Sequence, residues 1–218
     1  TDGTAQAFHA TVAGTLTPGV YHNMIFLTDR RLRTDPMDAQ REAGIHLGNG
    51  IGSHVDTNLA GLLGSLTGGT VGAGSVELNF KYIMLASAKM RANKIPGPYT
   101  CVLSPIQWYY ITSGTAAVPT LLQNNQMLMD SVIAQFYQGS YSGIDFIVDG
   151  NITAGSASKG GIFVREAIAL DVRAPFGIEP QRDASRGGGG WELNATMEYA
   201  YGVLRPTYGV QIVGMGTA

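Results

Sequence analysis

The sequence has few charged residues and no excess of either sign. Of its 218 residues, 14% are charged, whereas a typical soluble domain has about 25%. There are 14 Lys and Arg against 16 Asp and Glu, so the formal net charge is −2. This balance argues against binding nucleic acid through a basic surface, because neutralising many phosphates requires an excess of Lys and Arg. The low charge is consistent with a surface that is partly covered by other subunits.

Cysteine and long apolar runs are also scarce. Cys101 is the single cysteine, which excludes an internal disulfide and a cysteine-rich metal site. It lies in an apolar stretch, where we expect a small buried side chain and no nucleophile. No apolar run reaches the roughly 18 residues that cross a bilayer, and no signal peptide is recognisable. These absences favour a reducing, cytoplasmic setting.

Catalytic motifs are missing as well. His46 and His54 are eight residues apart on a predicted helix, too far from each other to share a metal ion or a proton. Residues 139–143 read GSYSG and place Tyr where a nucleophile elbow has Ser. Residues 155–161 read GSASKGG and lack the spacing of a phosphate-binding loop. The sequence therefore predicts no enzyme, no cofactor and no metal site, and an α/β enzyme stays only a remote alternative.

Two long periodic patterns are present. A stripe from Leu47 to Leu66 that recurs every three or four residues predicts a spine helix over about 35–66, with Pro36 in its first turn. Gly44, Gly48 and Gly52 form a second row on this helix, which predicts that another backbone packs closely against it. Strict alternation over 191–204 predicts a long, half-buried strand.

Shorter elements surround these two. We expect an extended segment at 5–29, helices at 75–93, from Ser104-Pro105 onward and at 119–136, and strands at 99–103, 144–152, 161–172 and 208–213. No Lys or Arg occurs between Lys94 and Lys159. This weakly charged middle block predicts a central lobe inserted into one built from both ends of the chain.

A charged and glycine-rich segment precedes the long strand. Arg182, Asp183 and Arg186 lead into Gly187, Gly188, Gly189 and Gly190. A strand and no helix follows, so a phosphate cradle would lack its helix N-terminus. We interpret residues 182–190 as the pliable tip of a hairpin, because glycine tolerates positive φ.

The order of several phrases resembles the major capsid proteins of tailed phages. The phrases are Thr28–Arg33, Arg91–Lys94 with Pro96–Tyr99, Leu103–Pro105 with Gln107-Trp108, Glu166–Leu170, Ile178–Ser185, Tyr201–Pro206 and Tyr208–Val210. The resemblance covers most of the chain. No single phrase is diagnostic, whereas their order and spacing together are specific.

The resemblance implies the α+β Johnson fold, which tailed-phage capsids share with encapsulin shells. Residues 1–16 would be the returning part of an extended loop that reaches a neighbouring subunit. Residues 17–71 and 174–206 would form a peripheral domain with the spine helix and a long-stranded antiparallel sheet. Residues 72–173 and 207–218 would form an axial domain with a mixed sheet and flanking helices.

The same resemblance implies a virion protein that assembles in the host cytoplasm, as hexamers and pentamers, into an icosahedral shell around double-stranded DNA. Its partners would be other copies, a portal, and scaffold, protease or decoration proteins. An encapsulin-like nanocompartment is the alternative with the same fold. Candidate contacts between subunits are Arg30, Arg31, Arg33, Arg182, Asp183, Arg186 and Arg205.

Overall fold

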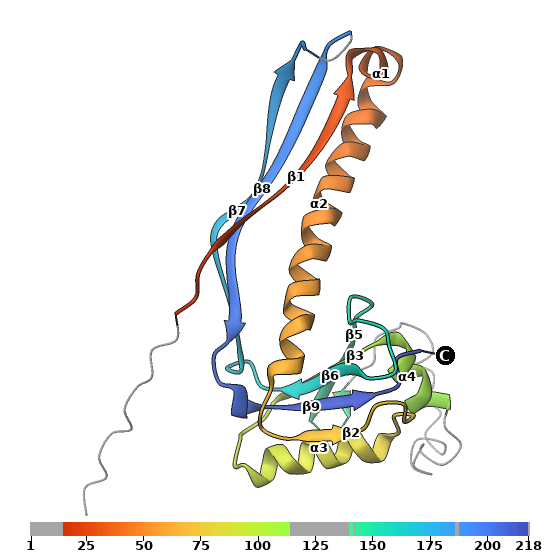
Figure 1. Cartoon of the computed structure of the whole chain (residues 1–218), viewed down its shortest axis with the longest axis vertical. Coiled ribbons are helices and arrows are strands. Elements are labelled where there is room, and N and C mark those ends of the chain that lie inside the picture. Colours follow the sequence, from red (N-terminus) through yellow and green to blue (C-terminus); the bar gives the residue numbers. More distant parts are fainter. Residues whose placement is uncertain (1–14, 114–139, 142, 186–187, 218) are drawn as a thin grey trace, which may run out of the picture.

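The helix α2 (Pro36–Gly61) runs along the long axis of the molecule (Figure 1). A computed structural model describes residues 15–113, 140–141, 143–185 and 188–217. Pro36 stands at the start of α2, where its missing N–H costs no hydrogen bond, and Asp38 complements the positive helix end. A short 3-10 helix (Leu62–Ser65) extends it, so the predicted spine helix over about 35–66 is present. In the described parts of the chain, no helix is long and apolar enough to cross a membrane.

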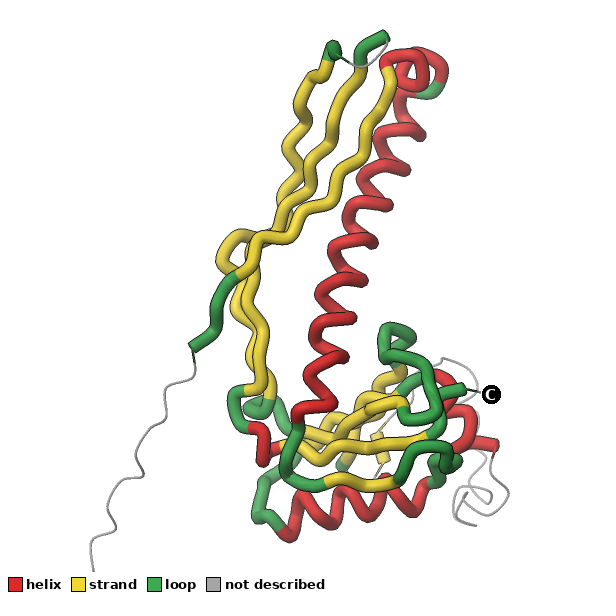
Figure 2. Tube along the Cα trace, viewed as in Figure 1, coloured by secondary structure: helices red, strands yellow, loops and turns green. Residues whose placement is uncertain are grey.

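An antiparallel sheet of three strands lies beside α2 and forms an elongated lobe with it (Figures 1 and 2). The strand order is β1 (Gly19–Thr28), β8 (Gly190–Val203) and β7 (Ile168–Asp183). Helix α2 packs on β1 and β8, and the short helix α1 (Asp29–Thr34) joins β1 to it. Leu47, Ile51 and Ala195 form the buried centre of this contact.

Strand β7 forms one edge of that sheet. It contains Pro175 and Pro180, and its register against β8 shifts between Val172 and Ala174 and between Ala174 and Gly177. Proline has no N–H to donate, and register shifts interrupt the row of backbone groups. The free edge of β7 is therefore irregular.

A mixed sheet of six strands forms a compact lobe at the other end of α2. The order is β2 (Thr70–Gly72), β9 (Gly209–Gly214), β6 (Ser158–Phe163), β3 (Tyr99–Leu103), β5 (Ile144–Val148) and β4 (Ser140–Tyr141). Helix α3 (Phe80–Ala92) packs on β2 and β9, and α4 (Pro105–Ser113) follows β3. Among the described residues, 16 buried side chains, including Ile83, Leu103 and Ile162, form the core of this lobe.

Several predicted elements differ from the observed ones. The helix expected at 75–93 begins at Phe80, because Ser75 has a positive φ of 61° and donates its N–H to the Ser156 carbonyl instead of capping a helix. The strand expected at 161–172 is two strands, β6 and β7, which belong to different sheets and are separated by a turn around 165–166. The helix expected at 119–136 and the loop at 1–14 lie outside the described residues.

The expected axial and peripheral domains stay a prediction, although the two sheets suggest slightly different boundaries. Strand β7 is continuous from Ile168 and joins the three-stranded sheet, so position 174 falls inside it. Strand β2 begins at Thr70 and joins the six-stranded sheet, two residues before the expected position 72.

The glycine row of α2 does not have the neighbour that we predicted. A Cβ placed on Gly44, Gly48 or Gly52 would meet nothing within 4 Å. The prediction of a closely packed backbone is therefore wrong within the described chain. The sheet reaches α2 through the side of the helix that carries Leu47 and Ile51, which leaves the glycine side open.

Candidate subunit interface

The β7–β8 hairpin, α1 and the start of α2 meet at one end of the elongated lobe, here called the distal end (Figures 1 and 2). Asp183 pairs with Gly190 across the hairpin, and residues 184–189 connect the two strands. Gly188 and Gly189 have φ values of +95° and +73°, which L side chains rarely adopt. The segment that we predicted as a hairpin tip thus joins two strands, while its pliability stays a prediction. Arg186 and Gly187 lie outside the described residues.

The tip is fastened to the start of α1. The Asp29 N–H donates to the Gly189 carbonyl at 3.1 Å. Arg182 Nη2 lies 3.0 Å from Asp29 Oδ2, and its guanidinium lies 5.7 Å from the centre of the Trp191 ring. The Arg182 side chain is 55% exposed, so solvent screens this ion pair and its contribution stays at about 0–1 kcal/mol.

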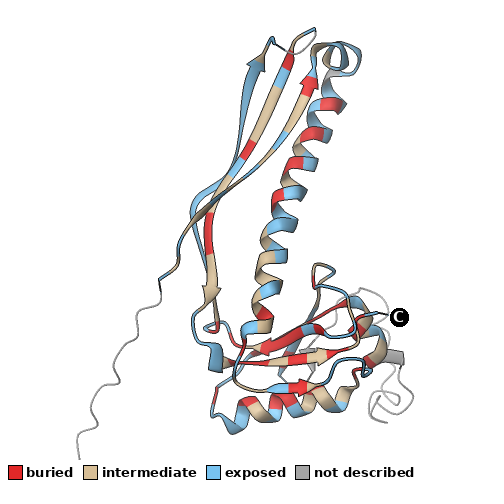
Figure 3. Cartoon of the chain, viewed as in Figure 1, coloured by how far each residue is buried: buried red, intermediate tan, exposed pale blue. Residues whose placement is uncertain are grey.

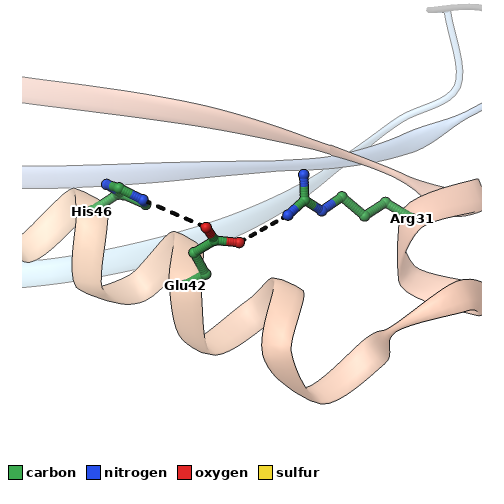
Figure 4. Close-up of polar contacts among 3 residues, drawn as sticks. All are labelled: Arg31, Glu42 and His46. Atoms are coloured by element: carbon green, nitrogen blue, oxygen red, sulfur yellow. Dashed lines mark hydrogen bonds and ion pairs between the residues drawn. The ribbon is translucent and has the colours of Figure 1, made fainter.

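Glu42 links α1 to α2 (Figure 4). Arg31 Nη2 lies 2.8 Å from Glu42 Oε2, and His46 Nε2 lies 3.8 Å from Glu42 Oε1. The Arg31 N–H also donates to Thr28 Oγ1 at 3.4 Å, which caps α1. All three side chains of the Glu42 group are more than half exposed, and they face water on the outside of the helix. These contacts join α1 to α2, but exposed pairs of this kind contribute only about 0–1 kcal/mol each.

The other candidate contact residues differ in position. Arg30 and Arg33 lie on α1 and are exposed, and neither takes part in the ion pairs found among the described residues. Asp183 accepts two hydrogen bonds from Ser185, at 2.8 Å from its N–H and 2.6 Å from its hydroxyl. Arg205 follows β8 at the opposite end of the lobe and lies 5.1 Å from the centre of the Tyr208 ring. Arg30, Arg31 and Arg33 therefore lie at the same end of the lobe as Arg182 and Asp183. Arg205 lies apart from them, at the opposite end.

A groove of about 420 Å³ opens between α2 and the hairpin at the distal end. Gly44 lines it from the helix, Ile178 and Pro180 line it from β7, and Trp191 and Leu193 line it from β8. We did not predict this groove. Two features of the sequence relate to it: the alternation of the apolar residues Ile178 and Pro180, and the glycine row of α2. Neither feature shows that α2 does not cover β7.

Strand β7 is exposed along most of its length (Figure 3). Leu170, Val172, Phe176 and Ile178 are 38–45% exposed. Leu170, Val172 and Ile178 pair with Tyr201, Tyr199 and Ala195 of β8, so they point to the same side of the sheet as the residues under α2. Helix α2 covers that side only over β1 and β8. Among the described residues, no element covers this side of β7 as α2 covers β1 and β8.

The compact lobe contains no comparable chemistry in the residues that the structure describes. None of them form a group of three His, Cys, Asp or Glu that could hold a metal ion. Cys101 is 0% exposed, and burial raises the pKa of its thiol, which makes it a poor nucleophile. It is the buried small side chain that we predicted.

A family model described as phage capsid protein matches residues 13–212. This match spans nearly the whole chain. The chain belongs to the phage capsid protein family. It is a major capsid protein, a structural component of a virion. No curated protein sequence matches it.

Solved structures show the same fold. The phage capsid protein is similar to a chain from Mycobacterium phage Che8, with a TM-score of 0.69, 16% identity, and coverage of 89% of this chain and 70% of that one. It is also similar to the capsid of Ralstonia phage GP4, with a TM-score of 0.71, 10% identity, and coverage of 93% and 74%. A virus-like particle from Pyrococcus furiosus matches with a TM-score of 0.57, 14% identity, and coverage of 89% and 75%. At these identities the likeness establishes the fold, and the α+β capsid fold predicted from sequence is confirmed.

Proposed function

We propose that copies of this chain assemble as hexamers and pentamers into an icosahedral shell around double-stranded DNA. The observation that carries the proposal is the uncovered apolar face of β7, where four large side chains are 38–45% exposed along one strand. Leu170, Val172 and Ile178 point to one side of the sheet, and apolar side chains gathered on one side favour a contact with another molecule more than scattered ones do. A shell supplies that molecule as further copies of the chain.

The distal end is the part of each copy that meets the next capsomer. Arg30, Arg31, Arg33, Arg182, Asp183 and Arg186 act there as ionic contacts, and Arg205 acts at the other end of the lobe. Arg31 and Arg182 already have partners within the chain, at 2.8 and 3.0 Å, so Arg30 and Arg33 are the cations most available to a neighbour. Each contact is weak on its own, and a shell gains from their number.

The shell confines DNA by its geometry and reads no sequence. The net charge of −2 supports this, because an excess of Lys and Arg is what binds many phosphates. The protein is a structural component and no enzyme, and it assembles in the host cytoplasm with a portal and with scaffold, protease or decoration proteins. Nothing in the comparisons favours an encapsulin-like compartment, since the family model that matches residues 13–212 is that of a phage capsid protein.

Expression of the full chain tests the proposal. We expect closed, uniform shells in negative-stain micrographs and a matching large species in light scattering. A monodisperse monomer at high concentration would contradict assembly. Nuclease-protected DNA in particles from infected cells would support a genome container, and an enzyme cargo without DNA would instead support the encapsulin-like alternative.

A further inference from the structure

The distal groove is lined mainly by apolar side chains, and α2 contributes Gln40 and Gly44 to it. Ile178, Trp191 and Leu193 form its walls, and a Cβ on Gly44 would meet nothing within 4 Å. Glycine inside a helix is destabilising relative to alanine, and no contact within the described chain requires it here. Because Gly44 has no side chain, the groove stays open to a side chain from another molecule.

Met37 is the most exposed large apolar side chain among the described residues, at 83%. It lies in the first turn of α2, seven residues before Gly44, and so on the same side of the helix. It belongs to the distal end, yet it does not line the groove of its own chain. Methionine is unbranched and flexible and fills irregular apolar gaps well.

Charges around Met37 and around the groove are complementary. Asp35 and Asp38 flank Met37, are exposed, and take part in none of the ion pairs found among the described residues. Arg182 lies over Trp191 at the groove but pairs with Asp29 at 3.0 Å, whereas Arg33, next to the groove-lining Leu32, takes part in none of the ion pairs found among the described residues. An acidic turn that carries an apolar side chain thus matches an apolar groove that has Arg33 beside one of its lining residues.

We infer that Met37 of one copy inserts into the distal groove of a neighbouring copy, with Asp35 and Asp38 facing the neighbour's arginines. The occupant is a second copy of the chain. Met37 and the distal groove lie at the same end of each chain, so two copies that meet through their distal ends bring a Met37 and a groove to the contact. This inference rests on the proposed shell, which provides the neighbour, and it names the contact that the distal end makes.

Filling the groove from within the chain tests this contact. Gly44→Leu places a side chain in the groove, while Gly52→Leu places the same side chain on the same helix outside it. Neither added Cβ meets an atom within 4 Å, and leucine favours helix, so both chains should fold with an undiminished melting temperature. We expect Gly44→Leu to lower the yield of shells at least tenfold and Gly52→Leu to leave it unchanged. Equal yields from the two variants would overturn the inference.

Cross-linking identifies the occupant. Met37→Cys and Ile178→Cys are made in separate chains that carry different tags, and the two are co-expressed and mildly oxidised. Cys101 is 0% exposed and stays out of the reaction. We expect a disulfide-linked dimer that contains both tags. Ile45→Cys, also on α2 and 51% exposed, replaces Met37→Cys as the control and should give no such dimer.

The two possible failures can be told apart. Shells without the mixed dimer, or with as much dimer from the Ile45→Cys control, would overturn the inference while the proposed function stands. Absence of shells from the unmodified chain would instead contradict the proposed function itself.

Discussion

The two lobes are stabilised in different ways. The compact lobe encloses 16 buried residues between its mixed sheet and α3. The buried centre of the contact between α2 and the three-stranded sheet consists of Leu47, Ile51 and Ala195. A lobe with its own core can hold its shape alone, whereas a long helix on a narrow sheet gains much of its stability from what packs on it afterwards. Among the described residues, the compact lobe therefore has the larger core of its own.

Matched core truncations should show the largest difference between the lobes. Ile162 in the compact lobe and Leu47 on α2 are both 0% exposed. Truncation of either to alanine costs about 2–5 kcal/mol in general. We expect Ile162→Ala in the upper part of this range, because its densely packed surroundings cannot collapse into the cavity, and Leu47→Ala in the lower part.

Urea denaturation of the unassembled full chain measures both free energies of unfolding. If Leu47→Ala cost as much as Ile162→Ala, the elongated lobe would be as well packed as the compact one. The distinction between the lobes would then fail.

Thiol labelling should show a smaller but clear difference. Cys101 in the compact lobe and Ala195 under α2 are both 0% exposed. We expect the thiol introduced by Ala195→Cys, in a Cys101→Ala background, to react with a thiol reagent at least tenfold faster than native Cys101. A tenfold ratio corresponds to a difference of about 1.4 kcal/mol in opening free energy. Similar rates would mean that both lobes open as one unit.

Native Cys101 also makes stability depend on pH. Burial raises the pKa of its thiol, so the folded chain keeps it protonated. The resulting contribution to stability is complete below the unfolded-state pKa of about 8.5 and declines as the pH rises above it. Cys101→Ala should remove this alkaline decline.

The smallest effect on folding should come from the exposed ion pairs. Arg182 pairs with Asp29 at 3.0 Å at the distal end, and Arg173 pairs with Glu198 at 3.7 Å farther along β7. We expect Arg182→Ala and Arg173→Ala each to change the free energy of unfolding by less than about 1 kcal/mol. Only Arg182→Ala should lower the yield of shells. A normal yield would remove Arg182 from the proposed interface.

Local signals predicted much of the fold. Strict alternation over 191–204 marked β8, and the apolar residues from Tyr99 to Leu103 marked β3 with the observed bounds. Pro36 and the leucine stripe marked α2. In each case one periodic face is buried, so the pattern of the sequence records the contact directly.

Long-range arrangement was harder to predict. The apolar run over 161–172 did not reveal where the chain passes from one sheet to the other. Ile162 and Ile168 are both apolar, but they pack in different hydrophobic clusters. Gly44, Gly48 and Gly52 indicated a close contact, yet no side chain or backbone of the described chain supplies it. The candidate arginines were chosen as subunit contacts for their charge alone, because no other feature of the sequence indicated their position. The groove at Gly44 depends on how far α2 extends over the sheet, which no local pattern encodes.

The prolines and register shifts of β7 have a consequence for how such a protein behaves at high concentration. An edge strand of 16 residues with a regular backbone would invite strands of other copies to pair with it without limit. Pro175 and Pro180 interrupt that pairing while leaving the face of the strand available. Pairing of backbones along this edge is thereby disfavoured. In the assembly proposed above, the prolines of β7 thus favour contacts between side chains over growth into open-ended fibres.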